Sequence, residues 1–408
     1  MSYYILPKNN NLININLKTE TNDIKSYTSQ SLYNFYKESK KQLNYLLKTN
    51  DSIITFENLL KVINPYEYIF SKIPGYKYSV SKLKTKSNIF YDILEIFNTL
   101  NVLDSFFNKS IKSIHISKNY SDSNKSIDFL RENNNDENTN FEDITEDIYN
   151  TINDKRYDFI FYEIKNIESE NLNYYTLNII QILMILLKYQ SSNGICLIKI
   201  NNIFHKPIID ILYILCSIYE KVYIIKPNTS NIMSFDKYIV CKNFTLNENK
   251  KEVYKNYYFK LAQIINTYLQ NNNNISSIID CEIPLYFINK IDDSNILIGQ
   301  QQLESIDQVI NILKNKNKED KIENIKKLNI QKSVVWCEKF KIPHNKFSEK
   351  VNIFLPLKIE NEEKDKEKDK DKDKEKDKEK DKDKEKDKDK DKDKDKEKDK
   401  DKENNEEI

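Results

Sequence analysis

The stretch from Ile195 to Phe244 constrains the fold of this chain more than any other part of the sequence. It opens with a short apolar run that contains one charged residue, Lys199. Apolar residues then recur at helical spacing between positions 208 and 219. Two runs rich in β-branched and aromatic residues follow, at 222–225 and 238–241. The pattern predicts strand, helix, strand, loop and strand, which is typical of an α/β fold.

Lys199 is the unusual residue of this pattern. A lysine inside a buried strand costs free energy unless it has a task or a partner. In an open α/β sheet, ligands bind at the carboxyl ends of the strands, which is where Lys199 would lie. Lys199 is therefore a candidate site residue. The competing interpretation is a lysine at a strand end whose ammonium group reaches solvent.

Three motifs in this stretch carry a resemblance to a known family. Residues 198–200 read Ile-Lys-Ile, residues 226–230 read Lys-Pro-Asn-Thr-Ser, and residues 236–241 read Asp-Lys-Tyr-Ile-Val-Cys. They resemble the end of the catalytic domain in FtsJ-like ribose 2'-O-methyltransferases, most of all the cap-type members of large DNA viruses. Weaker matches lie at residues 90–96, 114–116, 143–145, 157–160 and 336–340. The resemblance implies a Rossmann-like fold that uses S-adenosylmethionine to methylate a ribose hydroxyl of capped RNA.

The resemblance also implies a catalytic tetrad of Lys, Asp, Lys and Glu. In that family a lysine acts on the ribose hydroxyl, which is a poor nucleophile until a base takes its proton. The matching positions here are Asp92, Glu163, Lys199 and Asp236, in that order. Lys199 keeps the family's residue type. Glu163 and Asp236 keep the charge, whereas Asp92 reverses it. Without the resemblance, Asp92 is most simply an acid on a helix surface, and the other two are solvated or loop-end carboxylates.

The cofactor loop departs furthest from the family. Family members follow one strand with a glycine-rich loop, because glycine lets the cofactor approach the backbone closely. The matching residues 115–122 contain no glycine, and the whole chain has 3, against roughly 28 at average usage. His115 and Asp143 are the residues that the resemblance places at S-adenosylmethionine. Residues 118–138 are mostly polar and predict an exposed loop.

Two explanations for the shortage of glycine compete. One is a coding bias toward asparagine, lysine, isoleucine and tyrosine. The other is loss of the cofactor pocket, which we favour because a working pocket resists such a bias. A third possibility is a pocket rebuilt from different residues.

Composition limits the partners and the location. The chain has 408 residues, a formal net charge of +1 and 32% charged residues. This balance lacks the basic bias of many nucleic-acid binders, so RNA binding would depend on a local basic patch. The five cysteines are scattered without a CxxC pair, which indicates reduced thiols in an intracellular, cytoplasmic protein. The viral resemblance adds a viral factory or a virion as the location.

Other classes of protein are less compatible with the sequence. The three histidines lie far apart, which predicts no metal site. No apolar run approaches the ~18 residues of a membrane helix. The first residues also lack the basic and then apolar pattern of a signal peptide. We therefore expect neither a metal nor a membrane as a partner.

Composition and periodicity divide the chain into four parts. Residues 1–85 are expected to form a helical N-terminal extension whose first 29 residues are polar and poorly ordered. Residues 86–250 form the methyltransferase-like domain, and residues 251–358 a C-terminal helical extension. Residues 359–408 alternate lysine with aspartate or glutamate. No regular structure would bury apolar surface there, so this repeat predicts a disordered tail. The tail is either a solubilising or interaction segment or a neutral expansion.

The interpretation that we favour is a degenerate family member that acts as a non-catalytic RNA-binding or scaffold subunit, with RNA or a protein as its partner. The first alternative is an active RNA 2'-O-methyltransferase with a divergent pocket. That alternative predicts that Lys199, Glu163 and Asp236 cluster at an open cleft. The second alternative is a structural or assembly protein that keeps only the fold.

Overall fold

A seven-stranded sheet forms the centre of the chain in the computed structural model. The structure describes residues 2–49, 59–132, 135–152, 155–164, 171–271, 273–314, 319–345 and 347. The predicted tail at 359–408 lies outside the described residues.

The strands of the central sheet follow the order β1-β7-β8-β6-β5-β3-β4. β3 is parallel to β4 and β5, and β5 is parallel to β6. β8 is antiparallel to both β6 and β7, and β1 is antiparallel to β7. The bounds are β1 (Ser2–Leu6), β3 (Lys112–Ile116), β4 (Glu137–Phe141), β5 (Tyr157–Glu163), β6 (Gln190–Ile200), β7 (Tyr219–Lys226) and β8 (Lys237–Phe244). This is a mixed α/β fold with a mostly parallel sheet, consistent with a Rossmann-like arrangement.

The stretch from Ile195 to Phe244 folds as its pattern predicts. It contains the end of β6, then α7 (Lys206–Ile218), β7 and β8. Residues 195–198 are all buried, because β6 lies between β5 and β8 and helices cover both faces of the sheet. A continuous apolar run is what such a central strand requires.

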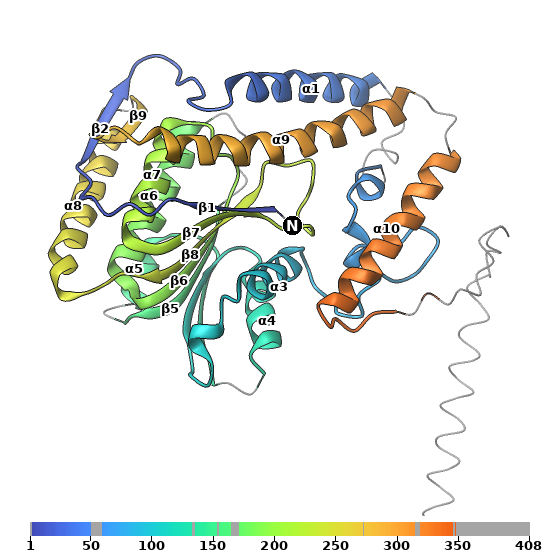
Figure 1. Cartoon of the computed structure of the whole chain (residues 1–408), viewed down its shortest axis with the longest axis horizontal. Coiled ribbons are helices and arrows are strands. Elements are labelled where there is room, and N and C mark those ends of the chain that lie inside the picture. The colour runs from blue at the N-terminus through green and yellow to red at the C-terminus, as the bar shows by residue number, and fades with distance from the viewer. Residues whose placement is uncertain are drawn as a thin grey trace, which may run out of the picture. The chain divides into compact units, whose positions relative to one another are not determined.

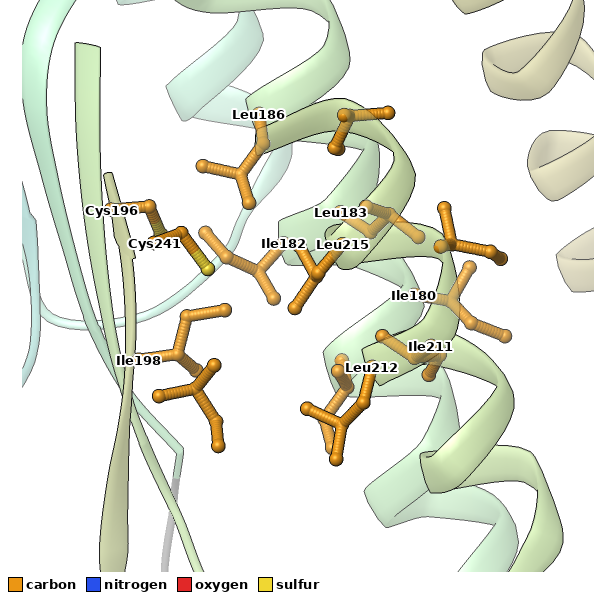
Figure 2. Close-up of a cluster of buried hydrophobic side chains, with 14 of the residues drawn as sticks. Ile180, Ile182, Leu183, Leu186, Cys196, Ile198, Ile211, Leu212, Leu215 and Cys241 are labelled. Carbon is orange, nitrogen blue, oxygen red and sulfur yellow. The ribbon is translucent and has the colours of Figure 1, made fainter. Parts of the chain in front are cut away.

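Helices pack on both faces of the sheet. On one face, leucines and isoleucines of α6 (Leu172–Tyr189) and α7 point toward Cys196 and Ile198 of β6 and Cys241 of β8 (Figure 2). α3 (Ile89–Leu100) and α4 (Tyr120–Leu130) cover the opposite face. Each fully buried leucine or isoleucine contributes about 1.5–3 kcal/mol. The other α-helices described are the short α5 (Glu146–Ile152) and the long α1 (Gln30–Thr49), α8 (Glu248–Asn271), α9 (Leu285–Lys314) and α10 (Glu319–Lys339).

The expectation that residues 1–29 are poorly ordered is wrong for residues 2–29. β1 forms one edge of the central sheet and pairs with β7, from Ser2 opposite Lys226 to Leu6 opposite Val222. β2 (Ile15–Glu20) pairs with β9 (Asn274–Ile279) in a second, two-stranded sheet. These strands are held by partners more than two hundred residues away in the chain, which local composition cannot reveal.

The expectation of an exposed loop at 118–138 is also wrong. α4 and the start of β4 occupy most of these residues. The buried Asp122 carboxylate accepts hydrogen bonds from the backbone of Lys86 and Ser87, which ties α4 to the segment before α3. A buried ion pair, 2.7 Å long, joins Arg131 at the end of α4 to Asp136 just before β4. Long-range bonds therefore order a segment that is polar in composition.

Helix α1 from the N-terminal part of the chain packs on helix α9 from the C-terminal part. α1 runs alongside α9 (Figure 1), and Leu43 of α1 shares an apolar cluster with Ile306 and Val309 of α9. Within the described ranges, no helix combines the length and apolar character that crossing a bilayer requires.

Candidate functional site

The order of the strands predicts a site at the end of the sheet where the parallel strands finish. The chain passes from β3 out to β4 and then returns to β5 on the other side of β3. Ligands of open α/β sheets bind outside the carboxyl ends of the strands at such a switch point. Ser117, Asp143, Glu163 and Lys199 lie at or next to the ends of β3, β4, β5 and β6, respectively.

Lys199 and Glu163 form an ion pair at this end of the sheet. The two residues are opposite each other in the register of β5 and β6, and Lys199 Nζ lies 3.0 Å from Glu163 Oε1. The pair is not sealed from solvent, because 15% of the Lys199 side chain and 17% of the Glu163 side chain are exposed. A small polar group has access to it.

The charges around Lys199 keep it protonated. Burial alone would lower the pKa of Lys199. Three nearby carboxylates, those of Glu163, Asp236 and Asp92, outweigh that effect and raise the pKa above its ordinary value. The structure thus brings all four tetrad-equivalent positions into one electrostatic cluster. A single lysine among three acids is suited to holding a positive charge, not to accepting a proton at neutral pH.

Asp92 is buried at the centre of a hydrogen-bond network. It is not the helix-surface acid that the sequence suggested, since its exposed fraction is 0%. Its Oδ2 accepts from Tyr238 at 2.9 Å, from Ser230 at 3.0 Å and from Asn88 at 3.1 Å, and its Oδ1 accepts from the Thr229 hydroxyl. Burial raises the pKa of Asp92, against the opposing effects of Lys199 and of the hydroxyl donors.

Glu95 lies one turn further along α3 and has a related role. Its two carboxylate oxygens accept from the backbone N–H of Asn228 at 3.0 Å and from the Asn228 side chain at 2.8 Å. Burial, and then the charge of Asp92, raises the pKa of Glu95 to about 7. Asp92 and Glu95 together fasten the turn at 227–230 to α3. Sequence reasoning did not select Glu95 as a site residue, although two acids at i and i+3 in an otherwise apolar helix are a usable signal.

The loop after β3 is engaged with Glu163. The Ser117 hydroxyl donates to Glu163 Oε2 at 2.5 Å, and the Asn119 side-chain amide donates to the same oxygen at 3.3 Å. The Asn119 backbone N–H in turn donates to Ser117 Oγ at 2.8 Å. Polar side chains therefore stand where the family's loop offers bare glycine backbone. Sequence reasoning did not select Ser117 or Asn119.

The two residues expected at the cofactor occupy different environments. His115 is buried, with Nε2 2.9 Å from the Ser113 hydroxyl and Nδ1 2.8 Å from the Ser123 hydroxyl. Burial lowers the pKa of His115 to about 3, so the imidazole is neutral. Asp143 is half-buried just after β4, where its charge, after burial, helps to raise the pKa of Tyr162.

Asp236 is positioned by the loop that joins β7 to β8. Lys226 Nζ donates to the backbone carbonyl of Asp236 at 2.8 Å and to that of Ser234 at 2.6 Å. Burial lowers the pKa of Lys226 to about 8, although Asp236 and Asp92 partly oppose the shift. Lys226 therefore shapes this loop and sets where the half-buried Asp236 carboxylate lies.

Lys237, the next residue, is a buried lysine that sequence reasoning did not select. Its exposed fraction is 0%. Its Nζ has a 3.3 Å hydrogen bond to Asn295 Oδ1 in α9. Burial, and then the charge of Lys226, lowers the pKa of Lys237 to about 7. The sequence Asp-Lys-Tyr around the start of β8 gives no sign that the whole lysine side chain is buried.

In the part of the chain that the structure describes, no cluster of three or more histidine, cysteine, aspartate or glutamate side chains has the arrangement of a metal site.

Comparisons with known proteins do not assign the chain to a family. No protein-family model matches the sequence, and no curated protein matches it. Among solved structures, one described as "Putative hemolysin from Streptococcus thermophilus" is similar at 13% sequence identity and a TM-score of 0.24, over 47% of this chain and 78% of that chain. A TM-score this low carries no argument about fold or function.

Proposed function

We propose that this chain is a degenerate FtsJ-like methyltransferase that transfers no methyl group and serves as a non-catalytic RNA-binding or scaffold subunit. The motifs at 198–200, 226–230 and 236–241 support the family. The mostly parallel sheet is compatible with the Rossmann-like fold of S-adenosylmethionine-dependent methyltransferases. The observation that carries the loss of catalysis is the cluster of three carboxylates around Lys199.

The chemistry of the tetrad depends on the charge at position 92. A lysine serves as a base only if it gives up its proton near the working pH. A second lysine at position 92 would lower the pKa of Lys199 through repulsion between like charges. Asp92 does the opposite, so Lys199 stays charged and does not take the proton of a ribose hydroxyl.

The residues at the switch point do not fit S-adenosylmethionine. Ser117 and Asn119 form hydrogen bonds to Glu163 in the loop where the methionine part would lie against backbone. Both ring nitrogens of His115 are engaged by the hydroxyls of Ser113 and Ser123.

Titration calorimetry of the full chain with S-adenosylmethionine tests the proposal, together with transfer of a tritiated methyl group to capped RNA. We expect no saturable heat and no transfer above the level of Lys199→Ala, which serves as the matched control. Saturable binding, with methyl transfer that disappears in Lys199→Ala, would refute the proposal.

An active enzyme with a divergent pocket is the second candidate, and the partial exposure of the Lys199–Glu163 pair favours it. If Lys199 were its base, the raised pKa would make the transfer rate climb with pH beyond the ordinary lysine range, near pH 10.5. A rate that levels off near pH 7 would exclude Lys199 as the base.

A further inference from the structure

The segment just before α3 carries a strong positive charge. Residues 68–91 contain five lysines and no acidic residue. The five lysines are all exposed: Lys72, Lys77, Lys82, Lys84 and Lys86. We call residues 72–86 the basic segment. The near-zero net charge of the whole chain hides this local excess.

Hydrogen bonds to the rest of the fold hold the basic segment in place. The Val80 N–H donates to the Tyr68 carbonyl at 2.8 Å, and the Lys82 N–H donates to the Pro343 carbonyl at 2.8 Å. Ser81 also forms a β-bridge with His344. Val80 and Ile73 are buried beneath the segment, with exposed fractions of 0% and 2%. The lysines therefore project from a fixed backbone.

The basic segment also presents an aromatic ring. Tyr78 is 42% exposed, and its ring centroid lies 5.5 Å from that of Tyr76. Two more exposed lysines come shortly before the residues that pair with the basic segment. They are Lys339, the last residue of α10, and Lys341. Residues 339–344 contain no acidic residue, and Glu338, directly before them, lies 3.9 Å from His344.

The basic segment leads to the candidate site. Asp122, in the first turn of α4, accepts from the backbone N–H of Lys86 at 3.0 Å and from that of Ser87 at 2.6 Å. α3 starts two residues later and carries Asp92. In Figure 1 this blue segment lies beside α10 and joins α3. A chain bound along the segment would reach the edge of the sheet that holds Lys199.

We propose that the basic segment binds the backbone of single-stranded RNA, with Tyr78 as a stacking platform for a base. This inference rests on the proposed RNA-binding function and assigns it a surface. Exposed lysines alternate with half-buried residues from 82 to 86, which suits the repeating phosphates of an extended strand. A row of lysines next to an exposed aromatic ring is the usual composition of single-strand binding surfaces.

Fluorescence anisotropy with a labelled, uncapped 20-nucleotide RNA of mixed sequence tests this surface on the full chain. The variant combines Lys82→Gln, Lys84→Gln and Lys86→Gln. The matched control carries Lys221→Gln, Lys251→Gln and Lys255→Gln, which are also exposed lysines, on β7 and α8, and of which Lys251 is in a surface ion pair with Glu248. Loss of three phosphate contacts should reduce the slope of log K against log salt by about 2 and weaken binding about 100-fold at 0.1 M salt. Tyr78→Ala should weaken binding about 10-fold and leave the salt slope unchanged.

Three outcomes overturn the inference, and they separate it from the proposed function. If the wild-type chain binds RNA and the triple variant binds equally well, the surface is wrong while the RNA-binding function stands. If the wild-type chain does not bind RNA even at 20 mM salt, the RNA-binding function itself fails. If the segment binds vesicles of phosphatidylserine and phosphatidylcholine but not RNA, its partner is an anionic lipid surface. Equal melting temperatures of the two triple variants confirm that both are folded.

Discussion

Replacing Asp92 by alanine removes the acceptor that four side chains share. Three of the donors are buried, with exposed fractions of 0% for Thr229, 3% for Ser230 and 0% for Tyr238. Each donor left unsatisfied costs about 1–3 kcal/mol. The variant no longer buries a carboxylate, which offsets part of that cost, so we expect a net loss of about 3–5 kcal/mol. With a urea m-value of about 3 kcal/mol per M, the midpoint of unfolding should fall by roughly 1–1.7 M.

Urea unfolding of the full chain, followed by circular dichroism, measures this loss. Asp307→Ala is the matched control, since Asp307 is an exposed acid on α9 and should change the free energy of unfolding by less than about 0.5 kcal/mol. A double-mutant cycle with Thr229→Val should also give a coupling energy of about 0.5–3 kcal/mol. If Asp92→Ala behaves like Asp307→Ala and shows no coupling to Thr229, the network around Asp92 does not hold the 227–230 turn.

Three further substitutions test buried charges elsewhere. Burial holds the pKa of Glu95 at about 7 in the folded chain, above its ordinary value of 4.5, so the folded state prefers the protonated acid and loses about 3 kcal/mol of stability as pH rises from 4.5 to 7. Glu95→Gln should abolish that loss in urea titrations at pH 5 and 7.5, and equal pH dependence in both proteins would contradict it. For Lys237 the folded pKa is lowered to about 7, so the folded state prefers the neutral amine and stability falls as pH drops from 10.5 toward 7. Lys237→Met should therefore stabilise the chain by about 2 kcal/mol at pH 7, a figure that includes the cost of an unpaired Asn295 oxygen. The gain should be smaller at pH 10. A lower melting temperature of the variant at pH 7 would count against this reasoning. Arg131→Met leaves Asp136 buried without its partner and should cost about 3–5 kcal/mol, whereas a loss below 1 kcal/mol in thermal unfolding would mean that solvent reaches the pair.

The central strands could be predicted because their signal is local. The apolar run that ends at Ile200 and the helical spacing that follows it are visible within fifty residues of sequence. β1 and α4 could not be predicted in the same way. β1 depends on pairing with β7, and α4 depends on bonds between Asp122 and the segment before α3. Composition at 1–29 and 118–138 reports polarity, and polarity does not reveal a distant partner.

The candidate site was also predictable only in part. The alternative of an active enzyme predicted that Lys199 and Glu163 lie together, and the register of β5 and β6 pairs them. The burial of Asp92 was not predictable, because one of its donors is Asn88, just before α3, and the others lie more than a hundred positions later in the chain. The helix sequence alone shows an acid among apolar residues, a pattern that also fits an exposed helix face.

The hydrogen-bond donors around position 92 fit a carboxylate, which supports the proposal that the chain has lost catalysis. The hydroxyls and the amide around this position all donate, so the site is built for an acceptor and not for an ammonium group. The same carboxylate anchors the turn that precedes Asp236, and it lies close enough to Lys199 to raise the pKa of that lysine. One residue therefore stabilises the loop and holds the lysine in its charged form. A carboxylate that stabilises the loop also raises the pKa of Lys199. A stable fold and a protonated Lys199 therefore occur together in this chain.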